Sequence, residues 1–230
     1  TDIQNSMADI EHHMLHFLDN HDEQRLASPE FAGSPEKGKP LMVVSATIST
    51  SPTMIYFGQE VGEAGNENGG FGTHSRTSIF DYVGVPNHQR WMNGGKFDGG
   101  QLSQSEKDLR DFYKRLLNFT ISSSALMGKY QEIHGLNRYS TDGYYPEVYS
   151  YVRWSDTQKL IVIANFSAVH TSHFELKIPA NVIAAWKLKD GVYPIKDQLY
   201  GKNSTKLQVV NGEGKVQISI APLESFIYGL

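Results

Sequence analysis

The sequence contains no cysteine, no long apolar run and no excess of basic residues. Without cysteine there is no disulfide, thiolate metal site or cysteine nucleophile, although any cellular compartment suits such a chain. The apolar runs reach only five residues, far below the ~20 that span a bilayer. With 21 basic and 25 acidic residues the net charge is −4, which argues against a protein that binds nucleic acid through a basic face.

The start of the chain has no initiator methionine, basic segment or apolar segment, so no signal peptide is visible. We expect either that a leader has been removed or that the sequence is a piece of a longer protein. Localisation is left unknown, and an extracytoplasmic or secreted protein would be compatible with it. The 230 residues are enough for one large domain or two modest ones.

The first part of the sequence has the pattern of an α/β fold. Apolar residues recur at helical spacing over residues 3–14 and predict an amphipathic helix, which leads into a short strand at 17–22. A second helix is predicted to begin at Pro40, which suits a first helical position, and to end before Pro52. The apolar run at 54–57 predicts a second strand. Two strands of this kind, each after a helix, are typical of a parallel sheet.

A long loop and a helix follow. Residues 58–101 are rich in glycine, asparagine and aromatic residues without a sustained period, which predicts a long functional loop. Ser103 and Glu106 have the spacing of a capping box, in which the hydroxyl bonds the amide three residues on and the carboxylate reaches back. The helix that begins there has a stripe predicted to be buried, formed by Leu109, Phe112, Tyr113, Leu116 and Leu117.

After about Gly135 the hydrophobic period changes from the helical value to two. Short strands separated by turn residues predict an antiparallel β-sandwich. We therefore divide the chain into residues 1–134 and a β-domain of residues 135–230. The strand candidates are 148–154, 160–166, 174–178, 207–210 and 216–220.

The most concentrated polar cluster is Asp19–Arg25, directly after an apolar pair. Parallel strands present ligand-binding groups at their carboxyl ends, so two carboxylates, an imidazole and a guanidinium there suit a polar substrate. From the residues alone, an exposed polar loop is an equally good interpretation.

Phe17–Asp22, followed by Arg25, resembles the seventh-strand motif of the α-amylase family of glycoside hydrolases, family 13. Ser51–Glu60 resembles the eighth strand of the same barrel, with Ser-Pro-Thr where the family has Gly-Thr-Pro. Residues 160–166 and 220–228 resemble the first and last parts of the family's carboxyl-terminal β-domain. The resemblance spans nearly the whole chain, in the family's order.

The resemblance implies the carboxyl-terminal part of a (β/α)8 TIM barrel at 1–134, followed by the antiparallel β-sandwich. It implies a retaining hydrolase of α-1,4-glucans, either starch-like polysaccharide or maltooligosaccharides. By matching position, Asp22 is the catalytic carboxylate that bonds hydroxyls of the sugar at the cleavage subsite and favours its distorted ring. The substrate-binding residues are His21, which donates to the same sugar, together with Asn20 and Arg25, which orient the cluster.

The family's nucleophile and general acid are expected upstream of this motif, the nucleophile in a Gly-x-Arg-x-Asp strand. The chain has no such sequence, and only 19 residues precede Asn20. A complete barrel takes ~250 residues, which the chain cannot supply beside a β-domain. We therefore expect a carboxyl-terminal fragment, inactive by itself, that self-associates through the open barrel.

Three other interpretations stay open. A non-catalytic carbohydrate-binding or structural module would use the aromatic residues of the sandwich. A zinc site would use His12 and His16, which are four residues apart, but no third ligand is evident. The third concerns the Gly-rich loop, residues 62–101, whose aromatic and basic side chains either bind sugar or anchor the loop. No cofactor is predicted; the resemblance allows Ca²⁺ in the longer enzyme, but we identify no site for it, and Asn66–Gly70 lacks the spacing of a known calcium loop.

Overall fold

The structure is a computed structural model that describes residues 6–7, 9–67 and 75–230. These residues group into two compact units, which we describe separately. The described residues up to 12, together with 47–50 and 118–230, are here called the β-domain. The described residues of 13–46 and 51–117 are called the loop-rich unit. Within these ranges, no helix is long and apolar enough to cross a membrane.

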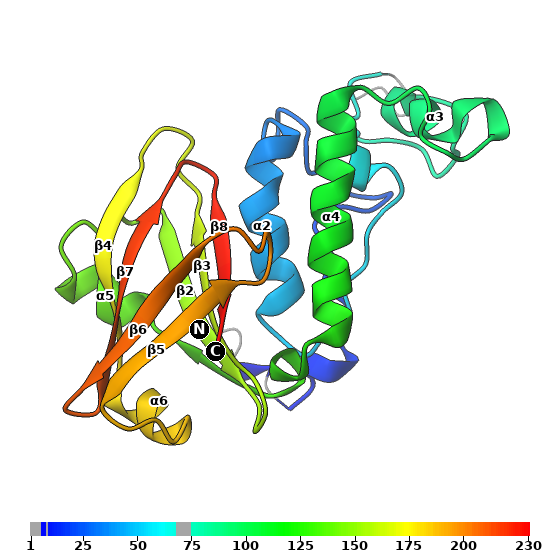
Figure 1. The fold of residues 1–230 in the computed structure, drawn as a ribbon. Helices are drawn as coiled ribbons and strands as arrows, with labels where there is room; N and C mark the ends of the chain where they lie inside the picture. Colours follow the sequence, from blue (N-terminus) through cyan, green and yellow to red (C-terminus); the bar gives the residue numbers. More distant parts are fainter. Residues whose placement is uncertain (1–5, 8, 68–74) are drawn as a thin grey trace. The chain divides into compact units, whose positions relative to one another are not determined.

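The β-domain is built on one antiparallel sheet of eight strands, drawn from green to red in Figure 1. Its spatial order is β1-β2-β3-β8-β5-β6-β7-β4, so β8 lies between two groups of strands. The strands are β1 (Lys129–Glu132), β2 (Val148–Trp154), β3 (Lys159–Asn165), β4 (Ser172–Ile178), β5 (Gly191–Asp197), β6 (Ser204–Val210), β7 (Glu213–Ile220) and β8 (Ser225–Gly229).

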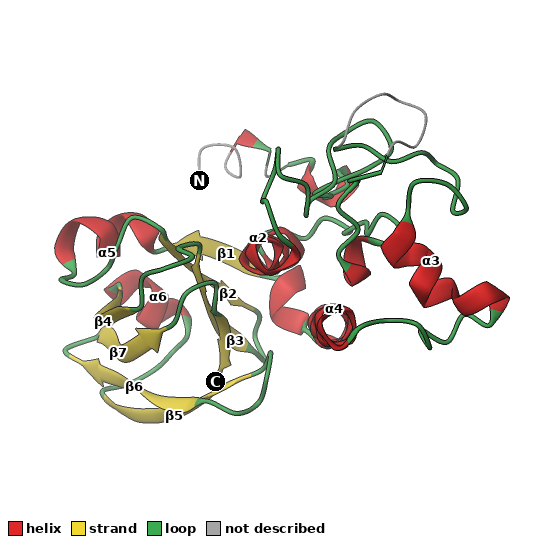
Figure 2. Cartoon of the chain, turned by 90° about the horizontal axis from the view of Figure 1, so that it is seen from above, coloured by secondary structure: helices red, strands yellow, loops and turns green. Residues whose placement is uncertain are grey.

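The sheet curls around a single hydrophobic core. Seen from above, the strands follow a curve, with α5 (His134–Ser140) and α6 (Ala180–Ala185) at its open side (Figure 2). Helix α5 contacts both β2 and β4, which lie in different halves of the sheet, and α6 contacts β7. The core takes side chains from β2 to β8, so curling lets one sheet cover both sides of it.

Alternating burial explains why these residues form strands. In β7, Gly214, Val216, Ile218 and Ile220 are buried, while the residues between them are exposed. The predicted antiparallel β-domain is therefore confirmed, with its strands hydrogen-bonded into one curled sheet. The sheet begins at Lys129, a few residues before the boundary we expected at 135.

The loop-rich unit contains the larger helices, and its best-predicted element is α4. The capping box forms: the Ser103 hydroxyl accepts from the Glu106 N–H at 3.3 Å, and the Glu106 carboxylate accepts from the Ser103 N–H at 2.7 Å. All of the predicted stripe except Leu117 is fully buried. The helices of this unit are α2 (Pro35–Thr47), η2 (Gln59–Val61), α3 (Pro86–Met92), η3 (Asn93–Gly95) and α4 (Gln104–Ser122), of which α2 and α4 end in residues of the β-domain. Helix η1 (Glu11–His13) spans the boundary between the two units, and η4 (Ser124–Met127) belongs to the β-domain.

The second predicted helix starts earlier than we expected. Helix α2 begins at Pro35, so the prediction of Pro40 as its first residue is wrong and Pro40 lies inside the helix. Ser34 precedes the helix, and its hydroxyl accepts from the N–H of Lys37 at 3.3 Å. Pro35 is thus the first helical residue, a position where proline is favoured because its missing N–H costs least in the first turn.

The predicted parallel strands at 17–22 and 54–57 are not formed in the described part of the chain. A single parallel bridge joins His16 to Thr53, with backbone bonds from His16 to Pro52 and from Met54 to His16. The assignment to part of a TIM barrel therefore stays a prediction. Within the helix predicted at 3–14, the described residues include one helical residue, Ser6, and the short helix η1, and Ile3 lies outside them.

Candidate functional site

The motif at 19–25 forms a turn held by its own side chains. The Asn20 amide oxygen accepts from the backbone N–H of Asp22 at 2.7 Å and of Glu23 at 2.9 Å. An asparagine that bonds the amides two and three residues on is a typical turn former, because its side chain substitutes for a backbone carbonyl. Asn20 thereby fixes the direction in which Asp22 leaves the backbone.

The exposed part of the site consists of His21, Asp22 and Arg76, which we call the polar cluster. The His21 imidazole Nε2 lies 3.2 Å from one carboxylate oxygen of Asp22, and Arg76 Nη2 lies 3.6 Å from the other. Arg76 also donates to the backbone oxygen of His21 at 3.2 Å. The side chains of Asp22 and His21 are 69% and 55% exposed, so a ligand in solvent can reach both. Exposed ion pairs of this kind contribute little to folding stability, so a ligand can replace these contacts at little cost.

Beneath the motif lies a buried ion pair. Asp19 and Arg25 are completely buried, with Arg25 Nε 3.5 Å from Asp19 Oδ2. The same carboxylate oxygen accepts from the Leu26 N–H at 2.9 Å. Burial raises the pKa of Asp19, and the neighbouring guanidinium opposes part of that shift. Because Arg25 has no exposed surface, its position suits an orienting role rather than contact with substrate.

The eighth-strand motif wraps around Arg25. The guanidinium donates to the Phe57 carbonyl at 2.6 Å and lies 4.7 Å from the ring centre of Tyr56. Gly58 follows with a φ of +83°, and a Cβ there would come within 3.1 Å of Arg25 Nη2 and of Glu63 Cβ. Glycine is therefore required both for the backbone conformation and for the close approach to the buried pair. The two motifs noted in the sequence thus meet in space around one side chain.

A third segment, beginning at Ser75, closes the site. The Arg25 N–H donates to the Ser75 carbonyl at 2.7 Å, and the Tyr56 hydroxyl donates to the Ser78 carbonyl at 3.2 Å. Burial raises the pKa of Tyr56, which keeps this hydroxyl a donor. The segment carries Arg76 to Asp22. Arg76 is one of the basic side chains of the Gly-rich loop for which the sequence left sugar binding and loop anchoring open. No local signal in the sequence pairs it with Asp22, 54 positions earlier.

The loop predicted at 58–101 contains a helix, contrary to our expectation of irregular structure throughout. Helix α3 begins at Pro86, and the Glu63 carboxylate accepts from the N–H groups of Asn87 at 2.9 Å and His88 at 3.2 Å. A carboxylate at a helix N-terminus satisfies amides that have no partner within the helix. Burial nevertheless raises the pKa of Glu63.

His88 is a buried histidine of the loop-rich unit. Its ring stacks on Trp91 at 5.6 Å and meets Phe57 edge-on at 4.9 Å. Burial lowers the pKa of His88, because the charged imidazolium loses hydration there, although Glu60 and Asp81 oppose the shift. The folded protein therefore holds this imidazole neutral at a pH where the unfolded chain is already taking up a proton.

This lowered pKa gives a pH dependence with a defined sign. As the pH falls below about 6.5, the unfolded chain binds a proton at His88 before the folded protein does, so the free energy of unfolding decreases. We expect lowering the pH from 7 to 5.5 to shift the denaturation midpoint less favourably in the wild type than in His88→Phe, which lacks this group. Asp19 and Glu63, whose pKa values burial raises, act in the opposite direction and contribute equally to both proteins. His134, whose pKa is also lowered by burial, contributes equally to both proteins.

The matched control is His173→Phe, which replaces an exposed histidine and should keep the wild-type pH difference. Chemical denaturation at the two pH values measures all three proteins. An unchanged pH difference in His88→Phe would contradict the assignment.

The structure does not provide the arrangement of histidines that the zinc hypothesis requires. Helix η1 ends at His13, and His16 lies in the parallel bridge, so His12 and His16 do not share a helical face. The His16 ring lies 3.2 Å from the Ser45 carbonyl oxygen. Over residues 6–7, 9–67 and 75–230, no three histidine or acidic side chains form a group that could hold a metal ion. The segment Asn66–Gly70, considered as a calcium loop, lies partly outside these residues.

The aromatic residues of the loop divide into two kinds. Trp91 packs against His88 and Phe97, as an anchor would. Phe80 and Tyr82 pair at 5.4 Å and are 49% and 69% exposed, so they offer surface to a ligand. Phe71 and His74, which we also considered, lie outside the described residues.

The chain is similar in structure to several solved proteins. No protein-family model and no curated protein sequence matches the chain. A noncanonic maltogenic α-amylase from Thermotoga neapolitana matches 94% of the chain with a TM-score of 0.60 at 16% identity, over 40% of its own length. The cyclomaltodextrin glucanotransferase CldA matches 99% with a TM-score of 0.63 at 18% identity, over 38% of its length. AmyP, crystallised with maltose, matches 93% with a TM-score of 0.59 at 23% identity, over 40% of its length.

The chain thus has the fold of a part of an α-amylase or cyclomaltodextrin glucanotransferase. The TM-scores show a shared fold, and at these identities the likeness is one of fold alone. Of the fold that the resemblance implied, the antiparallel β-domain is confirmed, and the barrel part stays a prediction. The chain spans about two fifths of the length of these proteins.

Proposed function

We propose that this chain is the carboxyl-terminal portion of a retaining α-amylase-type glycoside hydrolase that acts on α-1,4-glucans. The observation that carries the proposal is the polar cluster, an exposed carboxylate held between an imidazole and a guanidinium above a completely buried ion pair. The fold shared with α-amylases supports it, and so does the maltose found with AmyP.

In this proposal each side chain of the motif has a separate task. The Asp22 carboxylate accepts hydrogen bonds from two neighbouring hydroxyls of the sugar at the cleavage subsite. These bonds strengthen as the ring flattens and gains positive charge in the transition state. His21 donates from a ring N–H to the same sugar. Asn20 and Arg25 hold the turn, the first through the amides of Asp22 and Glu23 and the second from below.

The bond-breaking carboxylates lie outside this chain in the proposal. Retention needs a nucleophile and a general acid about 5–5.5 Å apart, because attack on the anomeric carbon and protonation of the leaving oxygen are separate steps. The strand with Gly-x-Arg-x-Asp that would supply the nucleophile is absent from the sequence. We assign no cofactor to this chain, and a calcium site would belong to the rest of the enzyme.

The experiment is to assay two proteins with maltoheptaose: this chain alone, and the product of the same gene with its preceding coding sequence. We expect hydrolysis by the longer protein only, with the newly formed sugar in the α-anomeric form. Hydrolysis by the chain alone at the rate of the longer protein would contradict the proposal that the nucleophile and general acid lie outside this chain. An inactive longer protein that binds no maltooligosaccharide would overturn the assignment to this class of enzyme.

A further inference from the structure

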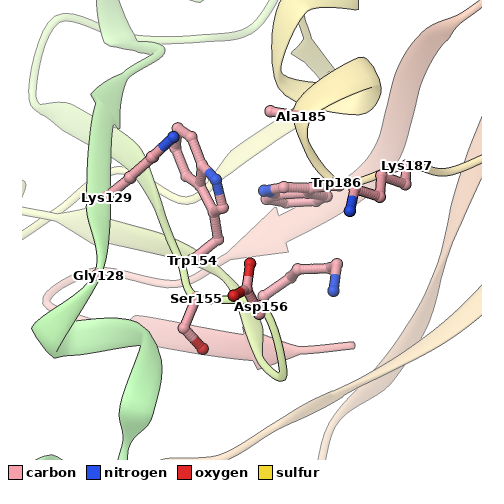
Figure 3. A pocket seen from close by; sticks show the side chains of 9 residues that line it. Gly128, Lys129, Trp154, Ser155, Asp156, Ala185, Trp186 and Lys187 are labelled. Carbon is pink, nitrogen blue, oxygen red and sulfur yellow. The ribbon is translucent and has the colours of Figure 1, made fainter.

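The β-domain contains a pocket of about 540 Å³ that the proposed function does not use (Figure 3). It lies between the loop that precedes β1, the β2–β3 turn and the end of α6. Its lining combines two indole rings, three lysines and one carboxylate. The indole rings belong to Trp154 and Trp186, the ammonium groups to Lys129, Lys159 and Lys187, and the carboxylate to Asp156.

The β2–β3 turn fixes one wall of this pocket. The Ser155 hydroxyl accepts from the N–H groups of Thr157 at 3.3 Å and Gln158 at 3.2 Å, and the Ser155 N–H donates to the Gln158 carbonyl at 2.9 Å. These bonds close a tight turn. Asp156 stands at its tip, where the carboxylate is exposed to solvent and faces the pocket.

The backbone of Trp154 is held from both sides. A Cβ at Gly128 would come within 2.1 Å of the Trp154 carbonyl oxygen, so only glycine allows β1 and β2 to approach this closely. The preceding residue, Arg153, is completely buried and donates to the carbonyls of Ile48, Leu126 and Gly128. The partly exposed indole therefore projects from a rigid base.

Trp186 forms the opposite wall at the end of α6. It is 3% exposed and belongs to the hydrophobic core, yet its indole N–H has no hydrogen-bond partner within the described part of the chain. Figure 3 shows that this N–H points toward Trp154, on the side of the pocket. A buried donor without an acceptor is costly, so it calls for a ligand oxygen. The next residue, Lys187, also lines the pocket and has a φ of +58°, in the left-handed region.

The mixture of groups selects among ligand classes. Three lysines against one carboxylate give the lining a net charge of +2, which repels a cation. The two indole rings offer apolar faces that a small inorganic anion does not use. A pyranose sugar uses all of these groups: its hydroxyls both donate and accept, and its apolar CH face packs on an indole ring.

We propose that this pocket is a second carbohydrate-binding site, which holds an α-glucan without cleaving it. The sugar packs on Trp154, with hydroxyls bonded to Asp156, to the lysine ammonium groups and to the Trp186 N–H. Asp156 is the single carboxylate among the lining residues, whereas glycoside hydrolysis by retention or inversion needs two. The choice of α-glucan as the sugar rests on the proposed function.

The test uses this chain and its own tryptophans as reporters. In Trp91→Phe, the two remaining tryptophans both line the pocket, so titration with maltoheptaose should change their fluorescence in a saturable way. The dependence of the fluorescence change on maltoheptaose concentration gives the affinity of the pocket. We expect Trp154→Ala to weaken binding about tenfold, because the stacking face is lost. Asp156→Ala should weaken it about fivefold, because a bidentate acceptor is lost.

The control is Tyr139→Ala, which removes an aromatic ring of the same domain that is 86% exposed on α5 and should leave binding unchanged. Since Trp154 also packs against the core, Asp156→Ala keeps the test informative if Trp154→Ala fails to fold. No saturable binding by the wild type, or equal binding by wild type and Asp156→Ala, would overturn the proposal.

This result is independent of the polar cluster. Asp22→Asn should leave the fluorescence titration unchanged, because Asp22 is not a lining residue of this pocket. Loss of the fluorescence response in Asp22→Asn would show that maltoheptaose reports on the first site and would contradict a second one.

Discussion

Replacement of Asp22 by Asn in the longer enzyme is expected to lower kcat/KM for maltoheptaose by about 10²–10³-fold. Asn keeps the shape of the side chain but removes its negative charge and one of its two acceptor oxygens. Both matter most in the transition state, when the sugar ring carries positive charge, so the loss should fall mainly on kcat rather than on KM. The measurement is steady-state hydrolysis of a maltooligosaccharide at several concentrations.

The substitution should leave the fold intact, because the Asp22 side chain is 69% exposed and its contacts to His21 at 3.2 Å and Arg76 at 3.6 Å lie at the surface. Glu23→Gln is the matched control: it removes a carboxylate from the next residue, whose N–H is held by the same Asn20 amide. We expect that variant to keep wild-type activity. Full activity in Asp22→Asn would refute the role given to this carboxylate.

The second large effect concerns stability. Arg25→Met should lower the free energy of unfolding of the loop-rich unit by about 3–5 kcal/mol, because it leaves the buried Asp19 without its partner. Met fills a similar volume, so the loss reflects mainly the uncompensated charge and the lost bond to the Phe57 carbonyl. Chemical denaturation measures it.

A double variant separates charge from packing. Asp19→Asn combined with Arg25→Met removes both charges and should be more stable than Arg25→Met alone, since no buried charge remains. Arg115→Met replaces an exposed arginine on α4 and should change stability by less than about 0.5 kcal/mol. Wild-type stability of Arg25→Met would show that the pair does not anchor the site.

Elements specified by neighbouring residues could be predicted from the sequence. The capping box and buried stripe of α4 involve residues within a few positions of each other, and both are found. The alternation in β2 and β7 likewise predicts strands. By contrast, β5 contains Pro194, which argues against a strand inside a sheet. Pro194 pairs with β6 alone, because β8 reaches β5 only at Lys196 and Asp197, so the missing N–H leaves no bond unmade on that side.

In the site, too, features formed by neighbouring residues could be predicted, whereas features that depend on distant segments could not. Asp19–Arg25 is contiguous, so its resemblance could be recognised and its turn former identified. The burial of Arg25 depends on Phe57, 32 residues away, and that of Arg153 on Ile48, 105 residues away. A buried arginine and an exposed one look alike in sequence, since the difference lies in carbonyl groups brought up by other segments. The pocket at Trp154 and Trp186 was missed for this reason.

The position of β8 also governs when the β-domain can finish folding during synthesis. Strands β1 to β3 can pair as soon as they are made, and so can β4 to β7, but β8 stands between the two groups and comes after both in sequence. Until residues 225–229 are available, each group keeps an open strand edge on which another chain could add. We therefore expect the domain to be most prone to aggregation just before this five-residue strand joins the two half-sheets.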